Sequence, residues 1–205
     1  MKRYISYSEY WTFYNKGKAE YYKNYILGIR EKPSEPQIFG TIVHAILADP
    51  DYDWQTEIKK LTKYPQDTYK RIIEKILKSV PTCEEREVSV FADCEEFSLY
   101  AGIDGVDDDM LTEYKTGQKY WTQEEVNEHE QITHYLLTWE KDGRPDLPFR
   151  LISINSRTGN FIEFRTHRTK KQLEEYYKKL LNFKEELIKL GWWDKKCKFN
   201  DRIQL

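Results

Sequence analysis

The hydrophobic pattern of the sequence changes near residue 84, and this change constrains the fold most strongly. Up to about residue 80, apolar residues recur at helical spacing, and we expect helices over Ser6–Leu27, Phe39–Ala48 and from Asp67 to Pro81. From about residue 84 to 190, short strand-like segments are interleaved with two further helices. The order indicates an α/β fold in which a central mixed sheet is flanked by helices and preceded by a helical N-terminal region.

The boundaries of these elements follow from turn and cap residues. Ser8 is the expected N-cap of the first helix and Gly28 its expected end. Residues 32–37 contain two prolines and predict a loop, and residues 51–65 are polar and predict irregular structure. The later elements are expected as strands at Glu87–Ala92, Phe97–Val106, Met110–Lys115, Leu151–Asn155 and Asn160–Arg165, and helices at Thr122–Glu140 and Lys170–Leu190.

Length and charge limit the class of protein. The 205 residues fit a single domain over 1–205, and an aromatic content of 15% argues against wholesale disorder. The net charge of -2 disfavours a protein that coats DNA through a broad basic surface. No apolar run approaches the ~20 residues of a membrane helix, and no apolar stretch follows the basic start. We therefore expect a cytoplasmic protein, of a cell or of an infected host, with no membrane partner.

The three cysteines, Cys83, Cys94 and Cys197, are too few and too scattered for a disulfide framework or a zinc site. Free thiols in a reducing compartment are the expected state.

An acidic pair is expected at the turn between the second and third strands. Asp104 follows Gly102-Ile103 in an apolar strand, where an unpaired carboxylate is costly to bury, although the glycines alone would also fit a turn or bulge. Glu113 and Lys115 share one strand face, an arrangement that exposed ion pairs also adopt. A hairpin centred on Asp108 would make Asp104 and Glu113 near neighbours. Two carboxylates with open coordination suit Mg²⁺ or Mn²⁺.

Two further positions are candidates for the same site. Gln131 and Tyr135 stand four residues apart and share a helix face, which helix amphipathicity alone would also explain. His44 lies in the apolar stripe of an early helix, where a lone histidine is more often a satisfied core residue than a metal ligand.

Five elements follow one another along nearly the whole chain: Ser6-Tyr7-Ser8 with Tyr21-Tyr22, Gly40-Thr41-Ile42-Val43-His44, Gly102-Ile103-Asp104, Glu113-Tyr114-Lys115-Thr116-Gly117 and Gln131-Ile132-Thr133-His134-Tyr135. In this order they resemble the RecB-like branch of the PD-(D/E)XK nuclease superfamily, which includes CRISPR-adaptation exonucleases and many phage and viral recombination nucleases. They are similar to its N-terminal helix, its G-x-x-x-H helix, a shortened G-x-x-D strand, its (D/E)-x-K-T-G core and its Q-x-x-x-Y helix.

The resemblance implies a restriction-endonuclease-like core and a role for each site residue. His44, Asp104, Glu113 and the backbone carbonyl of Tyr114 would hold a divalent cation, Mg²⁺ or Mn²⁺. Lys115 would orient the attacking water. The remaining pair, which would support the site and the scissile phosphate, is Gln131 and Tyr135.

Many relatives also carry four cysteines that bind an iron–sulfur cluster. Here only Cys197 lies in a tail that is similar to theirs, and the first helix has no cysteine. We expect no iron–sulfur cluster.

The expected function is a DNA nuclease, most consistent with an exonuclease on linear or single-stranded DNA in recombination, repair or phage and viral replication. The alternative is a nuclease-fold binding module in a CRISPR-adaptation or recombination complex, or a phage interference factor, with little or no cleavage. The aromatic first helix, with Lys16, Lys18 and Lys23, could stack bases, or its rings could simply form a core face.

Overall fold

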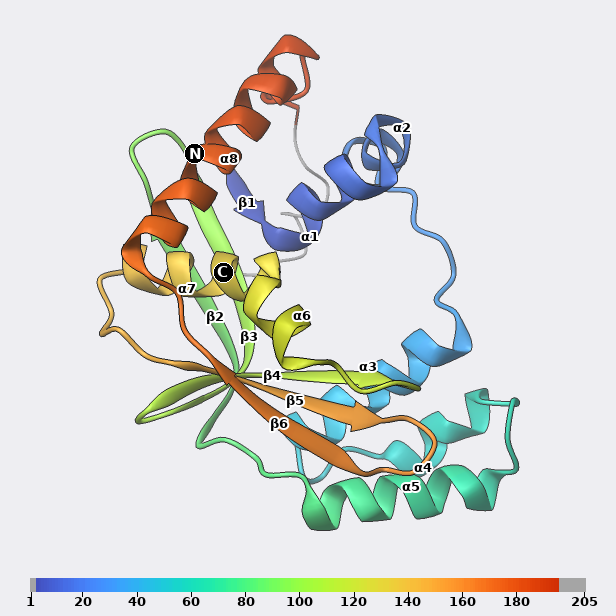
Figure 1. Ribbon diagram of the computed structural model, residues 1–205. Coiled ribbons are helices and arrows are strands. Elements are labelled where there is room, and N and C mark those ends of the chain that lie inside the picture. The colour runs from blue at the N-terminus through green and yellow to red at the C-terminus, as the bar shows by residue number, and fades with distance from the viewer. Residues whose placement is uncertain (1–2, 196–205) are drawn as a thin grey trace.

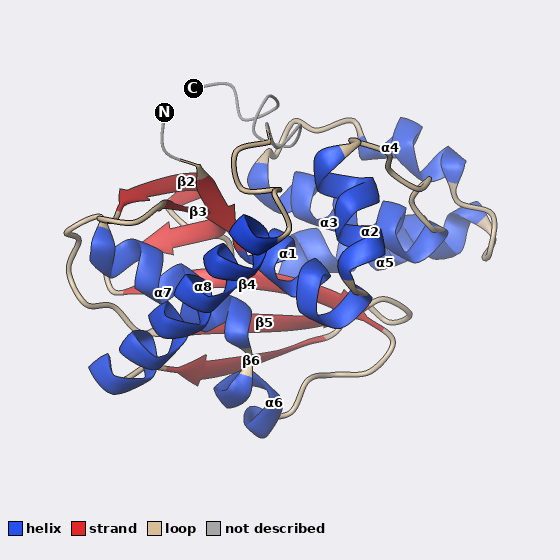
Figure 2. Cartoon of the chain, turned by 90° about the horizontal axis from the view of Figure 1, so that it is seen from above, coloured by secondary structure: helices blue, strands red, loops and turns tan. Residues whose placement is uncertain are grey.

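A computed structural model describes residues 3–195 and contains a six-stranded mixed sheet (Figures 1 and 2). The order of paired strands is β1-β3-β4-β5-β6, and β2, which lies off this path, also pairs with β3. The β1/β3 and β4/β5 pairs are parallel and the others are antiparallel. The strands are β1 (Tyr4–Ser6), β2 (Glu85–Asp93), β3 (Ser98–Asp107), β4 (Met110–Gly117), β5 (Phe149–Asn155) and β6 (Phe161–Thr166). The predicted α/β class with a central mixed sheet is confirmed.

Helices cover the sheet in two groups. Figure 2 shows α1, α7 and α8 gathered over one part of the sheet, and α3, α4 and α5 gathered at another. The α-helices are α1 (Tyr7–Trp11), α2 (Lys18–Tyr21), α3 (Glu35–Ala48), α4 (Trp54–Glu57), α5 (Gln66–Ser79), α6 (Gln123–Glu128), α7 (Glu130–Lys141) and α8 (Lys170–Lys189). Short π-helical and 3₁₀ stretches are η1 (Thr12–Lys16), η2 (Tyr22–Ile26) and η3 (Ile58–Lys60).

The central strand β5 shows how the two groups of helices divide the core. Phe149 and Leu151 belong to the apolar cluster that contains α7 and α8, whereas Ile152 and Ile154 belong to the cluster that contains α3 and α5. Side chains alternate between the two faces of a strand, so β5 is covered on both faces and reads as a nearly continuous apolar run.

The N-terminal segment differs from the single helix expected over Ser6–Leu27. Residues 4–6 form β1, which pairs with β3, so this part of the chain also contributes to the sheet. Ser6 rather than Ser8 is the N-cap, and its Oγ accepts a hydrogen bond from the Glu9 N–H at 3.3 Å. Gly17, with φ of 91°, breaks the helix. The expected end at Gly28 agrees with the structure, where this glycine has a positive φ.

The aromatic side chains of this segment are mostly core residues. Tyr10, Phe13, Tyr21 and Tyr25 are buried, and they pack in one cluster with residues of α8. Two of the lysines that could have tracked a DNA strand are in ion pairs, Lys18 with Glu186 and Lys23 with Glu20 and Glu31. The packing favours the core interpretation of the segment over base stacking.

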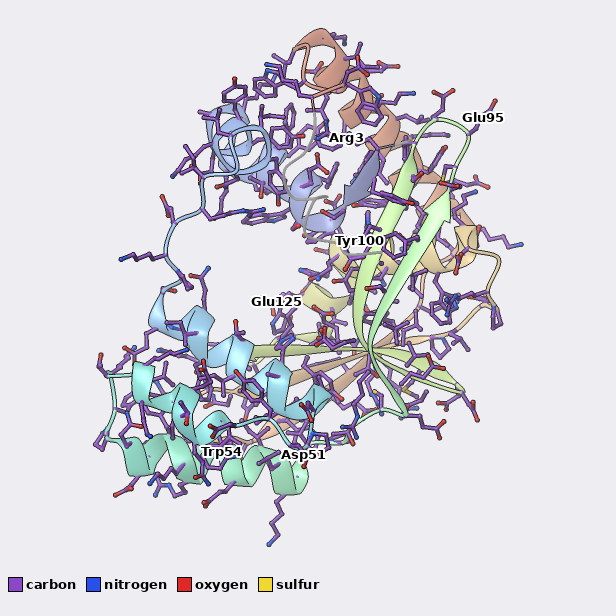
Figure 3. The ribbon with its side chains drawn as sticks, turned by 180° about the vertical axis from the view of Figure 1, so that it is seen from behind. Arg3, Asp51, Trp54, Glu95, Tyr100 and Glu125 are labelled. Carbon is purple, nitrogen blue, oxygen red and sulfur yellow. The ribbon has the colours of Figure 1, made fainter. Side chains whose placement is uncertain are left out.

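Arg3 joins the start of the chain to its far end. Its guanidinium donates to the backbone oxygens of Trp192 at 2.9 Å and Trp193 at 3.0 Å, and to the Tyr21 hydroxyl at 2.6 Å. It also forms an ion pair with Glu9. Figure 3 shows Arg3 between the N-terminal helices and α8. Charge-assisted hydrogen bonds of this kind tie the residue before β1 to the N-terminal helices and to the segment after α8.

The segment before α5 contains more helix than the sequence indicates. α3 begins at Glu35, four residues before the expected start, because Ser34 and Gln37 form a capping box. The 51–65 stretch, expected to be irregular, contains α4 and η3, and the Asp53 side chain caps α4 by accepting the Thr56 N–H at 3.2 Å.

The helix expected over Thr122–Glu140 is two helices, α6 and α7, separated at His129. This residue has extended backbone angles, φ -69° and ψ 114°. The buried Arg168 fills the joint, donating to the backbone oxygens of Val126 at 3.0 Å and His129 at 3.3 Å and to the Thr133 hydroxyl at 2.9 Å. A cation at the carbonyl end of α6 satisfies groups that a continuous helix would have bonded internally.

Replacing Arg168 with alanine is therefore expected to lower the free energy of unfolding by about 3 kcal/mol, because buried carbonyl groups lose their hydrogen-bond donor. Urea denaturation measures this loss. Arg165→Ala is the matched control, because Arg165 is exposed and its one ion pair within residues 3–195 is with Glu163 on its own strand. It should cost under about 0.5 kcal/mol. Equal effects of the two substitutions would contradict this role for Arg168.

Two of the three cysteines, Cys83 and Cys94, are described, and both are buried. Cys197 lies outside the described residues. No helix in the part of the chain that the structure describes is both long enough and apolar enough to cross a lipid bilayer.

Candidate active site

The centre of the candidate site is the point where β3 and β4 separate. Their antiparallel pairing runs from Asp107 opposite Met110 to Gly105 opposite Thr112. One residue further along, the backbone pairing of the two strands stops. There the side chain of Asp104 bonds to β4 instead, since its Oδ2 accepts the Tyr114 backbone N–H at 2.7 Å. The next pair in this register is Asp104 and Glu113, so the two acids lie opposite each other at the end of the β3–β4 pairing that is away from the turn.

Glu113 is an acid in a buried position, with only 3% of its surface exposed. Its Oε1 accepts from the Lys115 ammonium at 2.5 Å and from the Gln131 amide at 3.1 Å. Its Oε2 is buried and has no hydrogen-bond partner within the described part of the chain. Burial and the negative charge of Asp104 raise the pKa of Glu113, while Lys115 and His44 act in the opposite direction.

Helix α7 supplies the other side of this network. The Gln131 Oε1 accepts from Lys115 Nζ at 2.7 Å, and its amide nitrogen donates to the Tyr135 hydroxyl at 2.7 Å. One turn of helix separates Gln131 and Tyr135, so both reach the same point. The break at His129 gives α7 a start independent of α6, directly before Gln131. Lys115 is thereby held by two oxygens, from Glu113 and from Gln131.

Helix α3 brings His44 to Asp104 from another direction. Its Nδ1 lies 3.2 Å from Asp104 Oδ1, and its side chain is 30% exposed. A Cβ on Gly40, one turn earlier, would lie 3.0 Å from the Thr116 Oγ1, so the helix can approach the end of β4 this closely because residue 40 is glycine. Burial lowers the pKa of His44, but the hydrogen bond to Asp104 and the charges of Asp104 and Glu113 raise it overall.

Glu87 of β2 also reaches this site, and it was not among the residues predicted from the sequence. Its neighbours Arg86 and Val88 pair with Gly105 and Ile103, so Glu87 stands opposite Asp104. It has a φ of 52°, a rare value for a residue with a side chain. Ligand atoms of His44, Glu87 and Asp104 all lie within 4.8 Å of one another. Burial and the charge of Asp104 raise the pKa of Glu87.

These atoms suit a divalent cation. Oxygen and imidazole donors from three chain segments converge, and the unpartnered Oε2 of Glu113 is a buried acceptor that is costly without a cation or donor. In contrast, Asp107 of the turn is neutralised by Arg150 at 2.8 Å and lies at the other end of the hairpin register.

Comparisons with known proteins show the family and the fold of the chain. The family model of the PD-(D/E)XK nuclease superfamily matches residues 4–192. No curated protein matches the chain. Among solved structures, the crystal structure of a "Putative exonuclease" from Eubacterium rectale is similar, with a TM-score of 0.67 and 13% sequence identity over 99% of this chain and 89% of that chain. At this identity the likeness shows the shared fold. By its family model and its fold, the chain belongs to the PD-(D/E)XK nuclease superfamily.

Proposed function

We propose that the protein is a divalent-metal-dependent DNA nuclease that hydrolyses phosphodiester bonds. One observation carries the proposal: the buried Glu113 has one oxygen bonded to Lys115 and the other without a hydrogen-bond partner among the described residues, and it is next in register to Asp104 of the cluster His44, Glu87 and Asp104. A structural ion pair would satisfy both carboxylate oxygens, whereas this one leaves an acceptor beside a set of metal-ligand atoms.

The cation would be held by His44, Asp104, Glu113 and the backbone carbonyl of Tyr114, with Glu87 as a further acid. A bound Mg²⁺ or Mn²⁺ supplies charge neutralisation at the scissile phosphate and lowers the pKa of a coordinated water. Asp104 is fixed for this role, because its Oδ2 already accepts the Tyr114 N–H and its Oδ1 faces His44.

Lys115 would position the attacking water and offset the growing charge on the phosphate. Its ammonium has three donors, two of which bond to Glu113 and Gln131, and the side chain remains 26% exposed. The third donor is therefore available to a water or phosphate oxygen. Gln131 and Tyr135 would hold this ammonium in place and line the approach to the scissile phosphate.

The motifs also support membership of the RecB-like branch and action on DNA ends. A fluorescent linear DNA, single- or double-stranded, and a covalently closed circle of the same sequence would test this with Mg²⁺ or Mn²⁺ and with chelator. We expect the linear forms to shorten from their ends only when the cation is present, while the circle stays intact. Cleavage of the circle would contradict the exonuclease part, and cleavage in chelator would contradict the metal part.

His44→Ala is expected to raise the Mg²⁺ concentration for half-maximal cleavage by about 10–100-fold, because it removes one ligand and the partner of Asp104. The melting temperature should change little, since the side chain is 30% exposed. His167→Ala is the matched control, because His167 pairs with Asp146 on the surface and should leave the cation requirement unchanged. A large loss of melting temperature with a normal cation requirement would restore a core role for His44.

A further inference from the structure

The basic residues of the chain are unevenly distributed. Between Lys59 and Ser79, a stretch that leads into and includes α5, there are seven lysines and arginines against two acids, in a chain with a net charge of -2. Figure 1 shows α5 at the opposite end of the molecule from α8. Near-neutrality of the whole chain therefore hides a strongly basic segment.

Two cations of this segment and a third from another part of the chain line one hollow of about 330 Å³. Arg71 and Lys75 come from consecutive turns of α5, and Arg157 comes from the turn between β5 and β6. All three side chains are exposed. None of the three forms an ion pair with a carboxylate in the described part of the chain, although Lys70 of the same helix pairs with Asp67.

The backbone brings these like charges together. Gly159, in the β5–β6 turn, has a φ of 70°, and a Cβ there would lie 2.9 Å from the Ile72 carbonyl oxygen. Glycine at this position thus lets the turn sit directly on α5, which places Arg157 beside Arg71 and Lys75. Cations at i and i+4 of a helix repel each other weakly, so an anion bound between them would stabilise this arrangement.

The hollow is connected to the active site by the end of β4. Arg157 Nη2 donates to Gln118 Oε1 at 2.7 Å, and Gln118 follows Thr116 and Gly117 directly after Lys115. Gln118, Thr116 and the rings of Phe39 and Tyr64 line a common pocket at the end of β4. At the rise of a strand, the three residues from Lys115 to Gln118 span about 10 Å, which is the axial rise of about three base pairs of duplex DNA.

We propose that Arg71, Lys75 and Arg157 bind the phosphates of the DNA strand a few nucleotides from the bond that is cut. This inference rests on the proposed function for the identity of the anion. Two guanidinium groups and an ammonium are the groups that phosphate oxygens pair with most strongly, and their spacing over consecutive helix turns suits a run of phosphates rather than one isolated ion.

Binding in chelator tests the proposal without any cleavage. A fluorescent single strand of about 20 nucleotides is titrated at salt concentrations from about 50 to about 200 mM. The variant Arg71→Ala/Lys75→Ala/Arg157→Ala should bind at least about tenfold more weakly, and the slope of log K against log salt should fall by about 2, because each phosphate contact on single strands contributes ~0.7. The triple variant Lys171→Ala/Lys178→Ala/Lys189→Ala on α8 is matched in charge and should bind like the wild type.

A charge-preserving variant separates electrostatics from misfolding. Arg71→Lys/Arg157→Lys should retain most of the wild-type slope, and its melting temperature and that of the alanine variant should match the wild type. Weaker DNA binding by the Arg71→Ala/Lys75→Ala/Arg157→Ala variant, together with wild-type binding by the α8 variant, would support the proposal. An unchanged affinity and salt slope in that triple alanine variant would overturn the proposal. Failure of the wild-type protein to bind the single strand would overturn it too.

Failure of this proposal and failure of the proposed nuclease function can be told apart. A protein that binds DNA through the three cations but cuts no substrate would keep the proposal and refute the nuclease. A protein that cuts DNA equally well with and without the three cations, at substrate concentrations below KM, would keep the nuclease and refute the proposal.

Discussion

Lys115→Ala is expected to lower the rate constant for DNA cleavage by about 10²–10⁴-fold, the range typical of losing a positioned proton-transfer or water-orienting group. Lys115 is the only cation bonded to Glu113 in the described part of the chain, at 2.5 Å, and Gln131 holds the same ammonium from the other side. The substitution leaves the strand pairing of β4 intact, so the protein should fold. Single-turnover cleavage at saturating DNA measures the chemical step directly.

Lys178→Ala is the control for this substitution, because Lys178 is an exposed residue of α8. It should cleave at the wild-type rate. Lys115→Arg helps to separate charge from geometry: a guanidinium keeps the charge but not the compact ammonium, and we expect only partial recovery. Wild-type cleavage by Lys115→Ala would remove the lysine from the mechanism.

The second large effect concerns the link between the cation and stability. Because burial and the charge of Asp104 raise the pKa of Glu113, the folded metal-free protein binds this proton more tightly than the unfolded chain does. Its stability should therefore fall as pH rises above about 4.3, the ordinary value for glutamate. A cation that replaces the proton should restore that stability, more strongly at pH 8 than at pH 5.

At saturating Mn²⁺, about 100 times its dissociation constant, we expect a gain near 2.7 kcal/mol and a rise in melting temperature of about 5–10 °C for a chain of this size. Glu113→Gln should abolish most of the cation-induced rise, because the amide cannot carry the charge. Glu96→Gln is the control, since Glu96 is an exposed residue of the turn between β2 and β3 and pairs with Lys184. A cation-induced rise of equal size in Glu113→Gln would show that the cation binds elsewhere.

The parts of the site that the sequence predicts are local. Asp104 and Glu113 are joined by a short turn, so counting from Asp108 is enough to make them neighbours. Gln131 and Tyr135 need only the helical period, and the alternation of β4 puts Glu113 and Lys115 on one face. His44 needed the family resemblance, because an apolar helix stripe favours a core histidine.

The parts that the sequence did not predict depend on distant pairing or on single-residue backbone angles. β1 is only three residues long and pairs with β3 more than 90 residues away. Glu87 looks like an ordinary outward-facing strand residue, and only its register with β3 places it opposite Asp104. The sequence does contain this information: extending the antiparallel pairing from the turn between β2 and β3 places Glu87 opposite Asp104. The break at His129 depends on Arg168, which lies 39 residues further along.

The most direct test of the central claim compares the wild type with Glu113→Ala on one labelled linear DNA, with Mg²⁺, with Mn²⁺ and with chelator. The metal-dependent nuclease proposed here should consume the substrate with either or both cations, leave it intact in chelator, and leave it intact in all conditions once Glu113 is replaced. Substrate that stays intact with wild-type protein under every cation tested, for single- and double-stranded DNA alike, would contradict the claim and favour a protein that binds DNA without cutting it.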